Sequence, residues 1–259
     1  MAFKLDDFII DRVQYGFAED FNGNPLYTLT QLSEASINIT AESKDAVDST
    51  GTLIKRFWQG KSGEFTATNA MLNLNIIGAA SGEGKVVAGE GNPIEMPKII
   101  TVPAGTASVT LTNYVEGSVV VAELGTNGAM GAVYKMGSAA SDTEYVVSSN
   151  GTLTLPTVPN TQFIVKYDRN VTSGVSIANR ADKFPQTVRL TLKALAVDPC
   201  SADTLRAVYI VLPSFQVSPE VEIALTTDTT LNYTGALQVD YCSADKGLYT
   251  IYFAEEDEE

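Results

Sequence analysis

The chain of 259 residues contains no histidine. That absence excludes Ser-His-Asp and Cys-His catalysis in their usual forms and removes imidazole as a metal ligand. A phosphate-binding loop is also missing, because Gly82-Glu-Gly-Lys85 has neither the spacing nor the Ser/Thr of a P-loop and is typical of a flexible linker. We therefore expect no enzyme activity, no cofactor and no metal. A glycosidase based on two carboxylates stays open, since such a pair is defined by a separation in space.

Cysteine and long apolar runs are scarce as well. Cys200 and Cys242 have no CxxC spacing, which favours two small buried hydrophobes over a bridge, although whether they pair stays open. No apolar run approaches the ~20 residues of a spanning helix, so no membrane insertion is expected. The segment Met1–Phe8 places two acids where a signal peptide would have its apolar region, so secretion by that route is not expected.

Positively charged residues are also few. Seventeen Lys and Arg face 31 Asp and Glu, the net charge is −14, and the sequence ends in the acidic run Glu255–Glu259. Binding a polyanion depends on cationic side chains that release its counterions, so attraction to nucleic acid or anionic lipid is disfavoured. Simple solubility is the alternative explanation of the acidity.

Two local features invite a binding function. The segment Asp45–Gly51 offers oxygen ligands near a glycine, but it lacks the bidentate Glu of a calcium loop. Trp58 stands beside Phe57 and two cations, which favours an anchor in a core or a subunit interface over a sugar platform. Tyr249 and Tyr252 keep a carbohydrate-binding role open, but their apolar neighbours favour burial.

Short alternating segments separated by turn signals predict an all-β fold. A Gly/Ala/Ser/Glu segment, residues 78–91, resembles a linker. The simplest architecture is a β domain built from both ends of the chain, 1–91 and 173–259, interrupted by an immunoglobulin-like sandwich at 92–172. Seven strands are expected in the insertion: 99–102, 107–112, 118–124, 134–136, 144–148, 152–155 and 162–167. Outside it, strands are expected at 13–18, 26–41, 188–194, 207–212, 221–226, 236–241 and 248–253.

Two stretches near the start alternate with period two, and their polar sides are almost uncharged. In Ser36–Ala41, the residues Ile37, Ile39 and Ala41 point one way and Ser36, Asn38 and Thr40 the other. The stretch Phe65–Ile76 alternates likewise, but its apolar positions change from odd to even, which predicts a bulge or bend at Asn69-Ala70. A charged loop, 44–51, and a helical turn or short strand, 53–58, are expected between the two stretches.

These residues carry a resemblance to a known family. The pair of long strands joined by an Asp/Lys-rich connection (Ile37–Ile77), the inserted sandwich, and the return through Asn179-Arg-Ala-Asp-Lys-Phe-Pro185 resemble the tail tube proteins of tailed bacteriophages. The resemblance covers nearly the whole chain and rests on pattern, without a diagnostic motif. It implies hexameric rings whose long strands join into a continuous inner barrel, stacked with a helical offset into a tube through which DNA is ejected.

The resemblance also assigns surfaces. A neutral to acidic lumen would repel phosphates, and its expected residues are Asn38, Thr40, Thr66, Thr68, Asn73 and Asn75. The connection Ser43–Gly63 is expected to order on contact with the next ring through Lys44, Asp45, Asp48, Lys55, Arg56 and Lys61. Solvated loop charges are the alternative interpretation of these six residues.

The implied protein is a structural component of the virion, assembled in the cytoplasm of the host bacterium. Its main partner is itself, with sheath, baseplate or tail-terminator proteins as further candidates, and DNA passes without specific binding. The alternative from another class is an adhesin or carbohydrate-binding module with immunoglobulin-like domains. A ring-forming capsid decoration protein is a close variant of the leading hypothesis. The kind of tail, the host, the ring stoichiometry and the role of the insertion are not determined by the sequence.

Overall fold

The computed structural model describes residues 7–199, 201–227, 230–241 and 246–258. Cys200 and Cys242, whose pairing the sequence leaves open, lie outside these residues. Where the structure describes the chain it forms strands and one helix, which confirms the all-β fold class. The chain divides into two compact units: unit 1 joins Met1–Lys85 to Ile177–Glu259, and unit 2 is Val86–Ser176.

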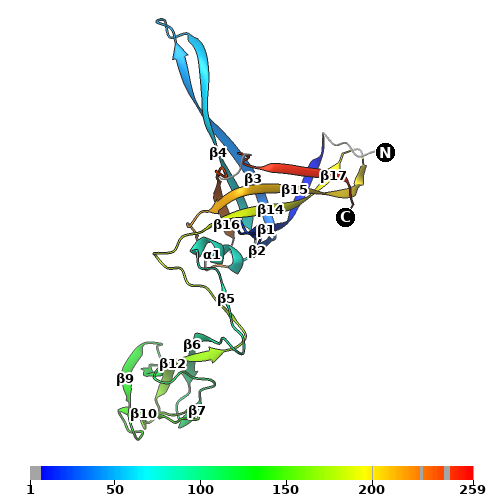
Figure 1. Ribbon diagram of the computed structural model, residues 1–259. Helices are drawn as coiled ribbons and strands as arrows, with labels where there is room; N and C mark the ends of the chain where they lie inside the picture. Colours follow the sequence, from blue (N-terminus) through cyan, green and yellow to red (C-terminus); the bar gives the residue numbers. More distant parts are fainter. Residues whose placement is uncertain (1–6, 200, 228–229, 242–245, 259) are drawn as a thin grey trace. The chain divides into compact units, whose positions relative to one another are not determined.

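Unit 1 is built on one antiparallel sheet (Figure 1). The strands run in the order β2-β1-β14-β15-β16-β4-β3, and β17 pairs with the middle of β15. Their bounds are β1 Ile9–Glu19, β2 Pro25–Thr30, β3 Leu32–Val47, β4 Leu53–Asn69, β14 Thr187–Asp198, β15 Ser201–Val217, β16 Leu231–Leu237 and β17 Thr250–Glu258. Strands from both ends of the chain are therefore neighbours in one sheet.

The alternation of side chains explains how this sheet encloses a core. In β14, Val188, Leu190, Leu192 and Ala194 are buried while Arg189 is exposed, as predicted from the sequence. Aromatic rings fill the centre: Phe65 contacts Phe215 and Tyr233 edge-on, with ring centroids 5.9 and 6.1 Å apart. Because β4, β15 and β16 all contribute to this cluster, the sheet curves around one core.

The helix α1, Leu74–Ser81, corrects one expectation. Strand β4 ends at Asn69, and the Asn73 side chain caps the helix by accepting a hydrogen bond from the backbone N–H of Asn75 at 2.9 Å. The predicted strand through Ile76 is therefore wrong. The predicted bend at Asn69-Ala70 is present, but there the chain leaves the sheet instead of continuing it. The apolar positions changed parity because a strand gives way to a helix, which has a different period.

The connection between the two alternating stretches is also different from the expected loop. Strands β3 and β4 stay paired from Ser43 with Trp58 out to Val47 with Leu53, and only a short turn joins them. Residues 43–62 thus form a two-stranded arm that extends beyond the other strands of unit 1 (Figure 1). A register shift between Ala41 and Ser43 marks its root. We call this segment the arm.

Most other strand predictions for unit 1 hold, with two exceptions. The segment 221–226 is not a strand. The strand expected at 236–241 is β16, which lies earlier, at Leu231–Leu237.

Unit 2 contains the seven predicted strands. They are β6 Ile94–Val102, β7 Ser108–Thr110, β8 Val120–Leu124, β9 Met130–Met136, β10 Glu144–Val147, β11 Thr152–Thr154 and β12 Gln162–Val171. They run in the order β6-β12-β8-β9-β10-β11-β7, and β9 and β10 are parallel. Side chains from β6, β8, β9, β10, β11 and β12, including Val102, Val121, Tyr134 and Leu153, form one buried cluster, so this sheet also closes on its own core. Asn150-Gly151 makes the predicted turn between β10 and β11.

The chain enters and leaves unit 2 through a short ladder. Strand β5, Val86–Val87, pairs antiparallel with β13, Val175–Ser176.

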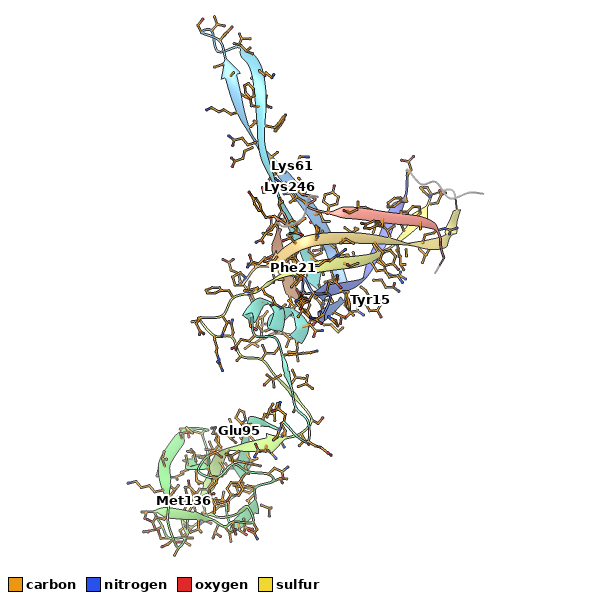
Figure 2. The ribbon with its side chains drawn as sticks, viewed as in Figure 1. Tyr15, Phe21, Lys61, Glu95, Met136 and Lys246 are labelled. Carbon is orange, nitrogen blue, oxygen red and sulfur yellow. The ribbon has the colours of Figure 1, made fainter. Side chains whose placement is uncertain are left out.

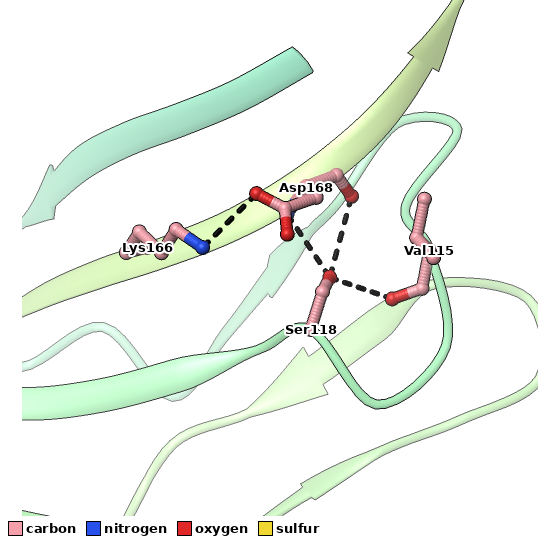
Figure 3. A network of polar contacts seen from close by, with 4 residues as sticks. All are labelled: Val115, Ser118, Lys166 and Asp168. Atoms are coloured by element: carbon pink, nitrogen blue, oxygen red, sulfur yellow. Dashed lines mark hydrogen bonds and ion pairs between the residues drawn. The ribbon is translucent and has the colours of Figure 1, made fainter. Parts of the chain in front are cut away.

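Inside the unit, the hydroxyl of Ser118 donates to the carbonyl of Val115 at 2.7 Å and accepts from the backbone N–H of Asp168 at 3.0 Å (Figure 3). The Lys166 ammonium lies 3.0 Å from the Asp168 carboxylate. The hydrogen bond between Ser118 and Asp168 fixes the loop before β8 onto β12.

Candidate assembly surfaces

The outward side of β16, β4 and β3 is a polar surface of mostly hydroxyl and amide groups, without Lys or Arg among the residues defined below. Side chains that lie opposite one another on neighbouring strands form rows across this surface. In two rows the opposite hydroxyl groups are hydrogen-bonded: Ser36 with Thr66 at 2.8 Å and Thr40 with Ser62 at 2.9 Å. We call this surface the polar face; it comprises Ser33, Ser36, Asn38, Thr40, Ser62, Glu64, Thr66, Thr68, Asn232, Thr234 and Ala236.

Four of the six predicted lumen residues lie on the polar face: Asn38, Thr40, Thr66 and Thr68. The other two do not. Asn73 is the helix cap, and Asn75 lies in α1, where its amide donates to the carbonyl of Thr28 at 3.0 Å and its oxygen accepts from Lys85 at 2.7 Å. Their expected place on a strand face is wrong, because the chain leaves the sheet at Asn69.

The sequence argument missed the contribution of β16. Asn232 lies opposite Thr68, and Thr234 lies opposite Thr66. The signal was present as alternation of Leu231, Tyr233 and Leu237 with polar residues, but Gly235 and the neighbouring Asn and Thr resemble a turn. Two carboxylates reach this surface. Glu64 lies between Asn38 and Ala236, and Glu34 accepts a hydrogen bond from the Thr68 hydroxyl at 3.5 Å.

The arm places its predicted contact residues on two different sides. Asp45 lies opposite Arg56, and the guanidinium donates to both carboxylate oxygens at 2.8 and 2.9 Å. This hydrogen-bonded pairing lowers the pKa of Asp45 and raises the pKa of Arg56. Two of the six residues therefore satisfy each other within one chain.

Asp48 shapes the tip of the arm. Its carboxylate accepts from the hydroxyl of Thr50 at 2.7 Å and from the backbone N–H groups of Thr50 and Thr52 at 2.9 and 2.8 Å. These donors, the Thr50 hydroxyl first, lower the pKa of Asp48. Because Asp45 is held by Arg56 and Asp48 by the turn, the two carboxylates of Asp45–Gly51 face separate partners and do not form a calcium loop.

Lys44 and Lys55 share the opposite side of the arm with Ala46 and Phe57. The Lys55 ammonium lies 5.4 Å from the centroid of the Phe57 ring, a distance typical of a cation–π contact. Lys61 lies at the root of the arm, and it lines a cleft of about 380 Å³ with Lys246 and Tyr249 (Figure 2).

Trp58 is 66% exposed, and Arg56 lies 5.7 Å from its ring centroid. An anchor in the core of its own subunit is therefore excluded for Trp58. Tyr249 and Tyr252 are also exposed, so their predicted burial is wrong.

Among the residues that the structure describes, no group of acidic or cysteine side chains could hold a metal ion. In the same part of the chain, no helix is long and apolar enough to cross a membrane.

Long strands, a broad polar face and an exposed arm are typical of a structural protein that works through its surfaces. A family model described as the YomU/Tube protein family matches residues 7–251. Because the match spans nearly the whole chain, the protein belongs to this family. The name of the family indicates a structural protein of a phage tube, which confirms the resemblance at that level. No curated protein matches the chain.

Proposed function

We propose that the protein forms stacked hexameric rings that make the tail tube of a bacteriophage, and that DNA is ejected through the bore. Membership of the YomU/Tube family supports a tube component of the virion. The single observation that supports the conduit is the polar face, whose exposed or partly exposed hydroxyl and amide groups include no Lys or Arg.

The physical reason is the charge of DNA. A phosphate backbone binds where Lys and Arg release its counterions, and a surface without cations offers no such site. In a hydroxyl pair such as Ser36 with Thr66, one of the two O–H donors is already used within the subunit, which leaves fewer donors for the passing strand. The polar face thus suits a wetted lining past which a polyanion slides.

The other parts have roles in the same proposal. Free strand edges join neighbouring subunits within a ring. The arm reaches the next ring, and unit 2, as an immunoglobulin-like domain, decorates the outside. Assembly takes place in the host cytoplasm, with sheath, baseplate or tail-terminator proteins at the ends of the tube.

Two experiments test this proposal. Electron microscopy of the purified protein is expected to show rings and tubes with a central hole; a protein that stays monomeric under all conditions contradicts it. In phage carrying Thr40→Lys, Thr66→Lys and Thr68→Lys together, we expect tubes of normal appearance and slowed DNA ejection. The matched control places Lys at Thr112, Thr126 and Thr172, exposed residues of unit 2. Normal ejection from the polar-face variant would argue against a lumen at this face.

A further inference from the structure

The two sides of the arm differ in charge. One side has Ser43, Asp45, Arg56 and Trp58, where the Asp45–Arg56 ion pair is neutral. The other side has Lys44, Ala46, Lys55 and Phe57 and contains no acid. We call it the cationic side. Neither lysine has an ion-pair partner among the described residues.

Such a side is unusual in this chain. The arm, residues 43–62, contains four cations and two anions, whereas the net charge of the whole protein is −14. Both lysines are exposed, and Phe57 between them is more than half exposed. A solvated arm has no need of an exposed aromatic ring, but an arm that docks gains from burying one.

Unit 1 also contains a groove with the opposite properties. It has a volume of about 470 Å³ and is lined by Glu64 and Glu220 together with Phe184, Pro219 and Ala236, all exposed. Phe184 is 69% exposed. No cation lines this groove, and neither carboxylate has a salt bridge within the described residues. We call it the acidic groove.

We propose that the cationic side of the arm docks into the acidic groove of a second copy of this chain. Lys44 and Lys55 face Glu64 and Glu220, and Phe57 packs on Phe184 and Pro219. Opposite charges select the partner and the register, while the aromatic contact excludes water. The docking rests on the proposed stacking of rings, and it names the surface that receives the arm.

One consequence concerns the polar face. Glu64 is a carboxylate among its hydroxyl and amide groups, and it lines the acidic groove together with Thr234 and Ala236, which also belong to the polar face. An arm that brings a lysine to Glu64 neutralises this carboxylate where two copies meet. A surface lysine and glutamate form a weak pair by themselves, so the aromatic contact is needed for a stable joint.

Charge reversal tests the docking, because every copy has both an arm and a groove. We expect Lys44→Glu with Lys55→Glu to raise the protein concentration needed for tube formation by about tenfold or more, and Glu64→Lys with Glu220→Lys to do the same. The chain with all four substitutions has the pair inverted, and we expect it to recover tube formation. The control is Lys135→Glu, an exposed lysine of unit 2, which we expect to assemble normally.

Circular dichroism and thermal unfolding of each variant show that the subunit is folded before assembly is scored by sedimentation and electron microscopy. If the wild-type protein makes tubes and both reversal variants assemble equally well, the docking is overturned and the proposed function is not. Failure of the fourfold variant to recover, when both reversal variants are folded, would also overturn it. A wild-type protein that never makes tubes overturns the proposed function and the docking with it.

Discussion

The phenolic oxygens of Tyr27 and Tyr233 lie 2.9 Å apart and join strand β2 to strand β16. The two strands are not neighbours in the sheet, so the bond crosses the inside of its curve. Tyr233 is 1% exposed, and its hydroxyl is therefore cut off from water. Burial raises the pKa of Tyr27 to about 12 and raises that of Tyr233 well above its usual value.

We expect Tyr27→Phe to lower the free energy of unfolding of unit 1 by about 1–2 kcal/mol, because it leaves a buried hydroxyl without its partner. Tyr233→Phe should cost less, since the remaining hydroxyl belongs to the less buried Tyr27. Urea unfolding measures both. The control is Tyr249→Phe at an exposed tyrosine, and an equal loss there would contradict the argument.

The same pair predicts a loss of stability at alkaline pH. A tyrosine whose pKa is raised on folding stabilises the protein fully below its unfolded pKa of about 10, and this contribution is lost as pH rises through the folded value. For Tyr27 that window extends to about pH 12. We expect the unfolding free energy of unit 1 to fall there, and the fall to be smaller in the variant with both tyrosines changed to Phe. Denaturant unfolding at a series of pH values measures it, and a fall that is unchanged in that variant would contradict this origin.

Asp48→Ala is expected to loosen the tip of the arm without changing the stability of unit 1. The substitution removes the acceptor for the N–H groups of Thr50 and Thr52, and the tip is exposed. Amide hydrogen exchange at these two residues should become faster, with Ser49→Ala as the control. Because the pKa of Asp48 is lowered, the wild-type turn should survive acidification until pH falls through that lowered value. Unchanged exchange in Asp48→Ala would show that the carboxylate does not hold the turn.

Gly82→Ala is expected to destabilise unit 1 by several kcal/mol. Gly82 ends helix α1 with φ +76°, and a Cβ atom there would lie 2.4 Å from the carbonyl oxygen of Phe184. Thermal unfolding measures the loss. Gly84→Ala has a similar φ of +73° but no atom within 4 Å of the added Cβ, so it isolates the backbone strain from the clash. Equal losses in both variants would contradict a clash.

Unit 1 is expected to fold without unit 2. Val87 pairs with Val175 at the entry to the insertion, so residues 88–174 can be replaced by an Asn-Gly turn that keeps this ladder. We expect the shortened chain to retain its strands by circular dichroism and to unfold in a single transition. Loss of the folded state would show that the two units depend on each other.

The sequence was a good guide where one side of a strand faces a core. Val188, Leu190 and Leu192 of β14 alternate with polar residues, and the strands of unit 2 lie between clear turn signals. It was a poor guide where a strand has no core beneath it. The arm contains many charged residues because it is exposed on both sides, and composition alone made it resemble a loop. Leu72, Leu74 and Ile76 fit a strand period over too few residues to exclude a helix.

The candidate surfaces show the same division. Local alternation identified Asn38, Thr40, Thr66 and Thr68, because the side on which a residue of a strand lies is a local property. The acidic groove could not be predicted from the sequence, because Glu64 and Glu220 belong to distant segments that only the folded sheet brings together. The pairing of Asp45 with Arg56 likewise depends on a register that the sequence does not show.

The pairing of β1 with β14 has a consequence for biosynthesis. Glu19 is bonded into the sheet beside Arg189, and the whole of unit 2 is translated between them. During synthesis on the ribosome, the edge of β1 that pairs with β14 therefore has no partner strand until unit 2 has been translated. A polypeptide that terminates before Thr187 lacks β14 and cannot complete the sheet of unit 1, so only chains translated beyond unit 2 can reach this fold.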